Sequence, residues 1–286
     1  MHLTESHIGR IFCFGCSFTN YHWLTWPDIL ASETEKPTYN FGRSGAGNQF
    51  IFNTICQADA KYNFNENDIV FIAWTNVCRE DRWLENQGWI TPGNIFTQDT
   101  YSKEWVERWA DPLGFLLRDI SLIHSVTSYL TYKKVRFVNM QMCQIIEQAD
   151  QQSFFKKIKQ NSEYNNIIET YKKTISTLYP SFMEVLWNND LYNNKILKQE
   201  GKYGKFSDGH PSPQEHMQYL ETVLDFRLSD NTCDRILKCE NNLQNTMKEL
   251  SKEYDRDFYV YELSADMHKK LSKNCKIGLE IYPQFI

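Results

Sequence analysis

Two short, uninterrupted apolar runs constrain the fold of this chain more than any other feature of its 286 residues. Residues 69–74, which follow Asp68, read Ile-Val-Phe-Ile-Ala-Trp, and residues 11–14 read Ile-Phe-Cys-Phe. Runs that are this short and uniformly apolar are typical of strands buried on both faces. Such strands occur in parallel sheets covered by helices on both sides. The sequence therefore predicts an α/β fold with a mainly parallel sheet.

Predicted strands and helices alternate along most of the chain, as they do in βαβ units. The helical segments show apolar residues at helical spacing and are separated from the strands by glycine, proline or polar turns. The predicted strands are residues 10–14, 37–41, 68–74 and 134–140; the predicted helices are residues 23–32, 48–60, 115–131, 153–179 and 214–226.

The sequence suggests a catalytic domain over residues 8–227 and a C-terminal extension over residues 228–286. A tryptophan-rich segment, residues 80–114, interrupts the first part with four of the chain's eight tryptophans, and we expect it to cover a site or to pack on the core. In the extension, residues 234–255 read as an amphipathic helix and residues 258–261 as a last strand. The helix is expected to pack on the domain, with a partner or homodimer helix as the alternative. Its apolar residues are Ile236, Leu243, Met247 and Leu250.

Overall charge and hydropathy narrow the function classes. A net charge of −5 and an isoelectric point near 5.8 argue against a protein that binds the nucleic-acid backbone through a basic face. No apolar run reaches the roughly 18 residues of a membrane span. The first residues lack the charged and apolar regions of a signal peptide, which predicts a cytoplasmic protein.

Eight cysteines raise the question of metal or dithiol chemistry, because Cys13 and Cys16 have CxxC spacing. Structural zinc needs four ligands, usually as two close pairs, and the next nearest pair, Cys233 and Cys239, is spaced too widely. A redox motif would open a helix, whereas Cys13 falls inside a predicted strand. No metal site and no cofactor are therefore expected.

A serine follows the first strand directly, in Gly15-Cys16-Ser17. Ligands of open α/β sheets bind at the carboxyl ends of the strands, so Ser17 is a candidate nucleophile. A serine hydroxyl needs a base within hydrogen-bond reach. Among seven histidines, His210 stands in a polar loop two residues after Asp208, which can orient the imidazole and stabilise its charged form.

Three groups are candidate oxyanion donors. Gly45 lies in the glycine-rich turn of residues 40–48, where a backbone N–H can approach a ligand closely. Asn76 follows the central strand and offers a side-chain amide, and the third donor is the backbone N–H of Ser17. Candidate substrate-binding residues are Arg79, Trp74 and Trp83, with Arg79 suited to an anionic group or to a surface salt bridge.

These motifs, in this order along the chain, resemble the SGNH (GDSL-type) hydrolase superfamily, whose four blocks contribute Ser, Gly, Asn and His. The resemblance covers residues 10 to about 226. It implies a three-layer α/β/α flavodoxin-like fold and ester hydrolysis or acyl transfer, often on acetylated carbohydrate. The counterparts here are Ser17, Gly45, Asn76 and His210, with Asp208 as partner of the histidine.

The chain departs from the family pattern at three places. Cys16 stands where the family has aspartate before the serine. The third block reads Ala73-Trp74-Thr75-Asn76-Val77 in place of Gly-x-Asn-Asp, so Thr75 is an alternative counterpart of the asparagine. Only Gly209 separates Asp208 from His210, which leaves open a Ser–His dyad whose ring is oriented by a backbone carbonyl.

The predicted function is a serine esterase that hydrolyses a small O-acyl ester, acetyl by preference, on a carbohydrate through an acyl-serine intermediate. An O-acyltransferase that uses the same residues is one alternative, and a non-catalytic glycan- or protein-binding domain is another. A nucleotide-binding site is disfavoured because Gly42–Gly47 is followed by Asn48-Gln49, where a phosphate-binding loop needs Lys and Ser or Thr.

Overall fold

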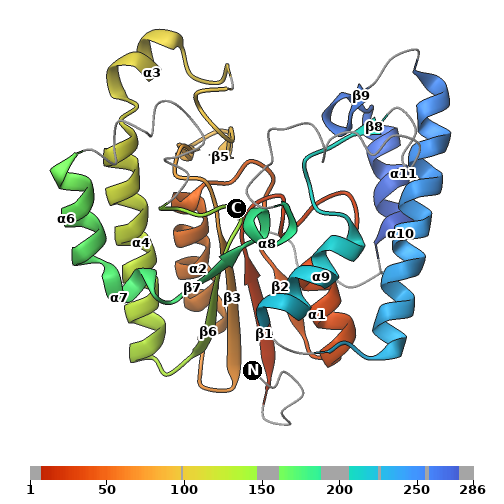
Figure 1. The fold of residues 1–286 in the computed structure, drawn as a ribbon, viewed down its shortest axis with the longest axis horizontal. Coiled ribbons are helices and arrows are strands. Elements are labelled where there is room, and N and C mark those ends of the chain that lie inside the picture. The colour runs from red at the N-terminus through yellow and green to blue at the C-terminus, as the bar shows by residue number, and fades with distance from the viewer. Residues whose placement is uncertain are drawn as a thin grey trace.

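The computed structural model describes residues 8–97, 99–146, 161–187, 206–224, 227–254 and 258–276. Its centre is a five-stranded parallel sheet with strand order β2-β1-β3-β6-β7, which confirms the predicted α/β class and is the flavodoxin-like order (Figure 1). The strands are β1 (Arg10–Phe14), β2 (Thr38–Asn40), β3 (Asp68–Trp74), β6 (Arg136–Gln141) and β7 (Leu178–Ser181).

Strand β3 lies at the centre of the sheet and of the hydrophobic core. All seven of its residues are buried, and it pairs in parallel with β1 on one side and β6 on the other. Phe71, for example, stands opposite Cys13 of β1 and Val138 of β6. Apolar runs predicted β1 and β3 to the residue, because strands buried on both faces are mainly apolar. Asp68, at the start of β3, is buried with Arg10 of β1 as its salt-bridge partner at 2.8 Å.

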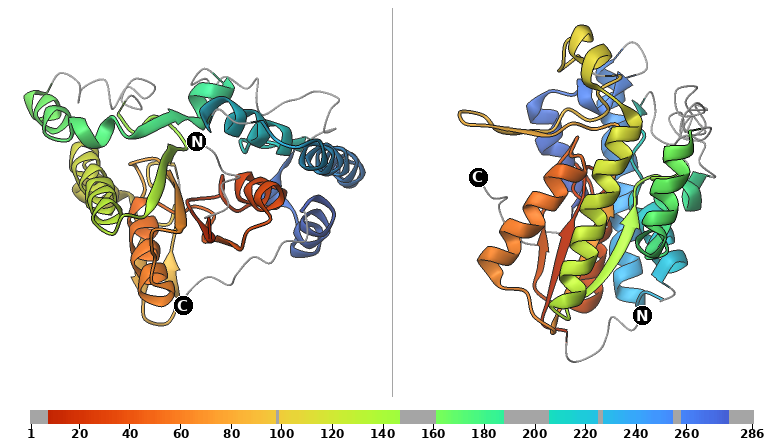
Figure 2. Two further views of the ribbon diagram at one scale, coloured as in Figure 1. Left: turned by 90° about the horizontal axis from the view of Figure 1, so that it is seen from below. Right: turned by 90° about the vertical axis from the view of Figure 1, so that its left-hand side faces the viewer.

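Helices cover both faces of the sheet, which gives the expected three layers (Figure 2). The bounds of α2 and α4 extend the predicted helices by one turn or less at each end. One face carries α1 (Trp26–Thr34) and α9 (Pro213–Leu224), and the other carries α2 (Asn48–Tyr62) and α4 (Pro112–Tyr132), with α6 (Ser162–Thr170) and α7 (Lys172–Ile175) beside α4.

Helix α1 begins three residues later than predicted, and its first turn explains why. The backbone N–H of Thr25 donates to the Asp28 carboxylate at 2.8 Å, as an N-cap residue does. Pro27 then occupies the first turn, where a missing N–H costs nothing. The preceding residues of the predicted helix form the loop that follows Ser17.

Strand β7 corrects the prediction of a helix over residues 153–179. Leu178–Ser181 pairs with β6 alone, so it is an edge strand. Its Pro180 is tolerated there because an edge strand has one side without ladder bonds. Four residues with a proline give no readable alternation, and helix α8 (Phe182–Trp187), which follows directly, was not predicted either. Residues 153–160 of the predicted helix lie outside the described residues.

The tryptophan-rich segment forms a hairpin of β4 (Arg82–Leu84) and β5 (Gly88–Ile90), followed by α3 (Lys103–Trp109). Trp89 packs edge-to-face on Phe50 of α2, with ring centroids 5.6 Å apart. Trp83 and Trp109 are at least half exposed. The segment therefore anchors to the core through Trp89 and stands above the carboxyl ends of the strands (Figure 1).

The C-terminal extension contains α10 (Asp230–Leu250), β9 (Phe258–Tyr259) and α11 (Ala265–Cys275), and β9 pairs in parallel with β8 (Phe206–Ser207). Helix α10 lies against α1 and α9 (Figure 1), and its predicted apolar residues are all buried within the chain. The extension also builds a second apolar cluster that includes Trp23 from the loop after Ser17. Its members are Trp23, Leu243, Met247, Leu250, Val260, Leu263, Leu271 and Cys275.

Along the described ranges, no helix combines the length and apolar character needed to cross a membrane.

Candidate active site

Ser17 and His210, 193 residues apart in sequence, are in contact. Ser17 Oγ lies 2.8 Å from His210 Nε2. Ser17 stands in the tight turn after β1, where Thr19 N–H and Asn20 N–H both donate to the carbonyl of Cys16. His210 stands in the loop between β8 and α9. The contact is of the length that allows a serine to transfer its proton to an imidazole.

Asp208 completes the series on the other side of the ring. Its Oδ1 lies 2.5 Å from His210 Nδ1 and accepts the backbone N–H of His210 at 2.6 Å. The carboxylate thus folds back on its own loop, which is how a spacing of one intervening residue still reaches the ring. With the proton of Nδ1 directed at Asp208, Nε2 is free to accept from Ser17.

Aromatic residues that follow Ser17 surround the imidazole. The Tyr21 ring stacks on His210 with centroids 3.7 Å apart, and its hydroxyl donates to Asp208 Oδ2 at 2.8 Å. Burial, followed by the charge of Asp208, raises the pKa of Tyr21 well above its usual value, so the hydroxyl keeps its proton. Trp23 Nε1–H donates to the carbonyl of Pro211 at 2.8 Å. Sequence reasoning missed both residues, although the run Tyr21-His22-Trp23 beside the nucleophile was a visible signal.

Gly45 occupies a position that only glycine fits. Its φ is +74°, and an added Cβ would lie 2.1 Å from the carbonyl oxygen of Thr91. Gly45 and Ser17 both line the same cleft. Within the described part of the chain, neither of their backbone N–H groups has a hydrogen-bond partner. Two N–H donors are thus available beside the serine hydroxyl.

Asn76 and Thr75, the alternative third-block residues, differ in what their donors do. The Thr75 N–H donates to Asn48 Oδ1 at 2.8 Å, and Thr75 is fully buried. Asn76 Oδ1 accepts the N–H of Cys78 at 2.6 Å, which orients the amide and leaves its NH₂ group without a partner among the described residues. Asn76 is 9% exposed and is not among the described residues that line the cleft.

A buried polar network that sequence reasoning missed fixes the end of β3. Asn48 Nδ2 donates to the carbonyl of Thr75 at 3.0 Å and to the Asp119 carboxylate at 2.8 Å. Asp119 in turn accepts from Arg118 at 2.6 Å. Burial raises the pKa of Asp119 to about 6 despite the neighbouring Arg118. Because buried polar groups are costly unless satisfied, this network sets the position of Thr75 and hence of Asn76.

The three predicted substrate-binding residues lie in different surroundings. Arg79 lines the cleft together with Ser17 and Gly45. Trp74 is fully buried in β3, with its indole N–H donating to Asn139 Oδ1 at 3.0 Å, so its ring has no surface to offer a substrate. The prediction that Trp74 binds substrate is therefore wrong, because its side chain is fully buried. Trp83 is half exposed on β4 and does not line the cleft among the described residues.

The cleft over Ser17 has a volume of about 900 Å³, within the range of small-molecule sites. One wall comes from the glycine-rich turn and residues 91–97, joined where Gly93 N–H donates to the Gly45 carbonyl at 3.0 Å. The other wall includes His268 and Tyr259 of the C-terminal extension, with the His268 ring stacked on His22 at 4.2 Å. Burial, and then the neighbouring His268, lower the pKa of His22 to about 4, so His22 is neutral near pH 7.

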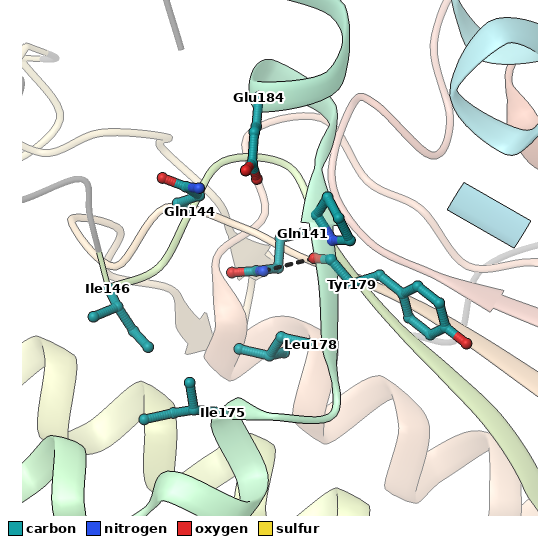
Figure 3. A pocket seen from close by; sticks show the side chains of 8 residues that line it. Gln141, Gln144, Ile146, Ile175, Leu178, Tyr179 and Glu184 are labelled. Atoms are coloured by element: carbon teal, nitrogen blue, oxygen red, sulfur yellow. Dashed lines mark hydrogen bonds between the residues drawn. The ribbon is translucent and has the colours of Figure 1, made fainter. Parts of the chain in front are cut away.

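A second pocket, of about 310 Å³, lies beside β6 and β7 (Figure 3). Gln141 donates to the carbonyl of Tyr179 at 2.7 Å, while the Tyr179 ring points away from Gln141. The described residues that line it include no serine, cysteine or histidine. Its described lining therefore offers no Ser–His or Cys–His pair.

Among the described residues, no three His, Cys, Asp or Glu side chains form a group that could hold a metal ion. Cys13 and Cys16 are buried free thiols. The Cys16 Sγ lies 3.5 Å from Met142 Sδ, and Cys16 is fully buried, so its side chain packs inward.

The sequence matches no family model and no curated protein. Several solved structures are similar to it, including the following three. A protein assigned to the lipolytic G-D-S-L family from Desulfitobacterium hafniense is 13% identical over 75% of this chain and 99% of its own, with a TM-score of 0.40. A protein assigned to the lipolytic G-D-S-L family from Veillonella parvula is 15% identical. The match covers 76% of this chain and 96% of that protein, with a TM-score of 0.40. A protein assigned as an acylhydrolase from Bacteroides fragilis is 12% identical. The match covers 86% of this chain and 90% of that protein, with a TM-score of 0.34. Similarity this distant leaves the chemistry to be inferred from the residues.

Proposed function

We propose that this protein is a serine esterase in which Ser17 is the nucleophile and His210 the general base. The observation that carries the proposal is the 2.8 Å contact between Ser17 Oγ and His210 Nε2, with Asp208 on the opposite ring nitrogen. Groups in this arrangement perform acyl transfer on several unrelated folds.

The reaction follows from these contacts. His210 Nε2 takes the serine proton as Oγ attacks the ester carbonyl, and a tetrahedral oxyanion forms. The C–O bond to the alcohol then breaks, His210 returns the proton to the departing oxygen, and an acyl-Ser17 ester remains. Water repeats the sequence in place of the serine and releases the acid. Asp208 stabilises the imidazolium that exists between these steps.

The oxyanion needs donors that are in place before charge develops. The unpartnered N–H groups of Ser17 and Gly45 are proposed for this role, and the side-chain amide of Asn76 is proposed as the third donor. Asn76 is preferred to Thr75 as this donor, because the Thr75 N–H already donates to Asn48 Oδ1. Removing one such donor typically lowers the rate by about 10²–10³-fold.

The proposed substrate is a small O-acyl ester, acetyl by preference, on a carbohydrate. Hydroxyl and amide side chains in the cleft wall suit a polyhydroxylated alcohol, and half-exposed Tyr259 offers a ring against which a sugar can stack. These wall residues are Ser44, Thr91, Asn94 and Thr97. The breadth of the cleft, about 900 Å³, keeps O-acyl transfer to a second hydroxyl as the other candidate.

Turnover of p-nitrophenyl acetate tests the proposal. Ser17→Ala and His210→Ala should each lower kcat/KM by about 10⁴-fold or more, because each removes a member of the nucleophile–base pair. Ser125→Ala, on the exposed face of α4, is the matched control and should retain full activity. Full activity in Ser17→Ala or His210→Ala would refute the assignment and favour a binding domain.

A further inference from the structure

Arg79 is held rigidly at the edge of the cleft. Its Nη1 donates to the carbonyl of Ala46 at 2.7 Å, and its own carbonyl accepts from Arg118 at 2.8 Å. A β-bridge to Asn94 fixes the backbone from the other side. The guanidinium therefore occupies a set position beside the glycine-rich turn.

Most donors of this guanidinium have no oxygen acceptor. A guanidinium carries five N–H groups. Nη2 reaches only Met142 Sδ at 3.6 Å, a weak acceptor, and Nε is buried with no hydrogen-bond partner. Across the described residues, Arg79 forms no ion pair with a carboxylate. A half-buried cation left in this state is costly unless a ligand supplies the missing charge.

Nearby carboxylates are occupied elsewhere. Asp81 accepts the backbone N–H groups of Gly47 and Phe50, both at 2.8 Å, at the start of α2. Glu80 pairs with Arg118 at 2.6 Å. Asp208, the acidic residue among the described cleft-lining residues, is bound to His210 and Tyr21. The charge of Arg79 acts on buried Asp81, but among the described residues no carboxylate forms an ion pair with its guanidinium, and Asp208 in the cleft lining is already bound.

The sulfur of Met142 contacts both Arg79 and the residues that precede Ser17 and Asn76 in the sequence. Met142 Sδ lies 3.6 Å from Arg79 Nη2 and 3.5 Å from Cys16 Sγ, the side chain that precedes Ser17. The same sulfur lies 3.5 Å from Thr75 Oγ1, next to Asn76. Arg79 also lines the cleft together with Ser17 and Gly45, so an anion bound at Arg79 would share that cleft with the ester under attack.

We propose that Arg79 forms an anion subsite and that the preferred substrate carries a negatively charged group, such as a carboxylate or phosphate, near its ester bond. This inference rests on the proposed esterase function and names its substrate class. The planar fork of Arg79 suits a carboxylate or phosphate, each of which presents two oxygens.

Matched pairs of esters test the subsite. Mono-p-nitrophenyl succinate carries the anion on the acyl side and 4-acetoxybenzoate on the alcohol side; the methyl ester of each is its neutral partner. For at least one pair, kcat/KM should be about tenfold or more higher for the acid. Arg79→Gln should bring that ratio to one or below, and Arg79→Lys should keep part of it. Arg82→Gln, an exposed neighbour outside the cleft lining, removes the same charge and should leave the ratio unchanged.

Two results would overturn the inference: acid-to-methyl-ester ratios near one for both pairs, or a ratio that Arg79→Gln leaves intact. Failure of the esterase proposal looks different, since no ester would then be turned over. In that case, calorimetric titration of monomethyl succinate against dimethyl succinate tests the subsite directly. Binding of the anion that disappears in Arg79→Gln supports it; equal binding by the variant, or no preference for the anion, contradicts it.

Discussion

The Asp208 carboxylate accepts three hydrogen bonds within the site. Their donors are the imidazole of His210, the backbone N–H of the same residue and the hydroxyl of Tyr21. The motif around Asp208 and His210 could be predicted from sequence, because both residues stand close together in one polar loop. For Tyr21, the sequence showed only an aromatic residue close to the nucleophile; its bond to Asp208 spans 187 residues, and no local pattern encodes it.

Tyr21→Phe isolates the hydroxyl that holds Asp208. The ring still stacks on His210, but Asp208 Oδ2 loses its donor, so the carboxylate is oriented less firmly. We expect kcat to fall about tenfold with little change in KM, the effect of one hydrogen bond to a charged group. Steady-state kinetics with p-nitrophenyl acetate measure it.

Tyr129→Phe is the control for that change, because it removes another tyrosine hydroxyl that donates to a carboxylate, Asp59, away from the cleft. Its kcat should equal that of the unmodified protein. Unchanged kcat in Tyr21→Phe as well would mean that Asp208 needs no help from Tyr21.

Three elements from distant parts of the chain meet above the sheet: the glycine-rich turn, the tryptophan-rich segment and the C-terminal extension. The turn was predicted to belong to the site, and its Gly45, which has a positive φ, lines the cleft. The contributions of Tyr259 on β9 and His268 on α11 were not predicted, because they depend on how the extension packs beside the catalytic domain, which no local pattern encodes. Edge strand β7 was missed for the related reason that four residues carry too little periodicity.

We propose that the extension and the catalytic domain fold as one cooperative unit, since Trp23 enters the apolar cluster of α10 and α11 and Leu24 N–H donates to the Cys275 carbonyl. Leu271→Ala opens a cavity in this cluster, away from Ser17. It should lower the free energy of unfolding by about 3 kcal/mol.

Thermal unfolding followed by tryptophan fluorescence and by residual esterase activity tests this unit. Both signals should move together to lower temperature in Leu271→Ala, in a single transition. An activity midpoint that stays in place while part of the fluorescence change shifts would show that the extension unfolds separately.

At the scale of the whole molecule, the α/β class with a parallel sheet could be predicted from the runs buried on both faces, whereas the three-layer flavodoxin-like arrangement was expected from the resemblance alone. Titration of buried groups could not be predicted, because it depends on the final packing. His216, on α9, is fully buried and packs edge-to-face on Phe182. Burial, followed by the charge of His210, lowers the pKa of His216 to about 3.

Acid should therefore destabilise the fold through His216. A histidine with a lowered pKa contributes stability above its unfolded value of about 6.5, and that stability is lost as the pH falls toward 3. Asp81 and Asp119, whose pKa values burial raises to about 6, act in the opposite direction below pH 6. Because the unmodified protein and a His216 variant both contain Asp81 and Asp119, the contribution of these two carboxylates cancels when the two proteins are compared at the same pH.

His216→Leu removes the titration at similar volume. Relative to the unmodified protein, its free energy of unfolding should improve by about 2 kcal/mol on going from pH 8 to pH 5. Urea unfolding at the two pH values measures the difference. A difference that does not change with pH would mean that His216 is not held neutral by burial.

Labelling with a fluorophosphonate probe, followed by intact-mass and peptide mass spectrometry, tests most directly whether Ser17 is activated. Such a probe phosphonylates a serine whose proton a neighbouring base removes, whatever the natural ester. We expect one adduct per chain, located on Ser17, absent in Ser17→Ala and strongly slowed in His210→Ala. An unmodified Ser17, or labelling that persists at the same rate without His210, would contradict the account.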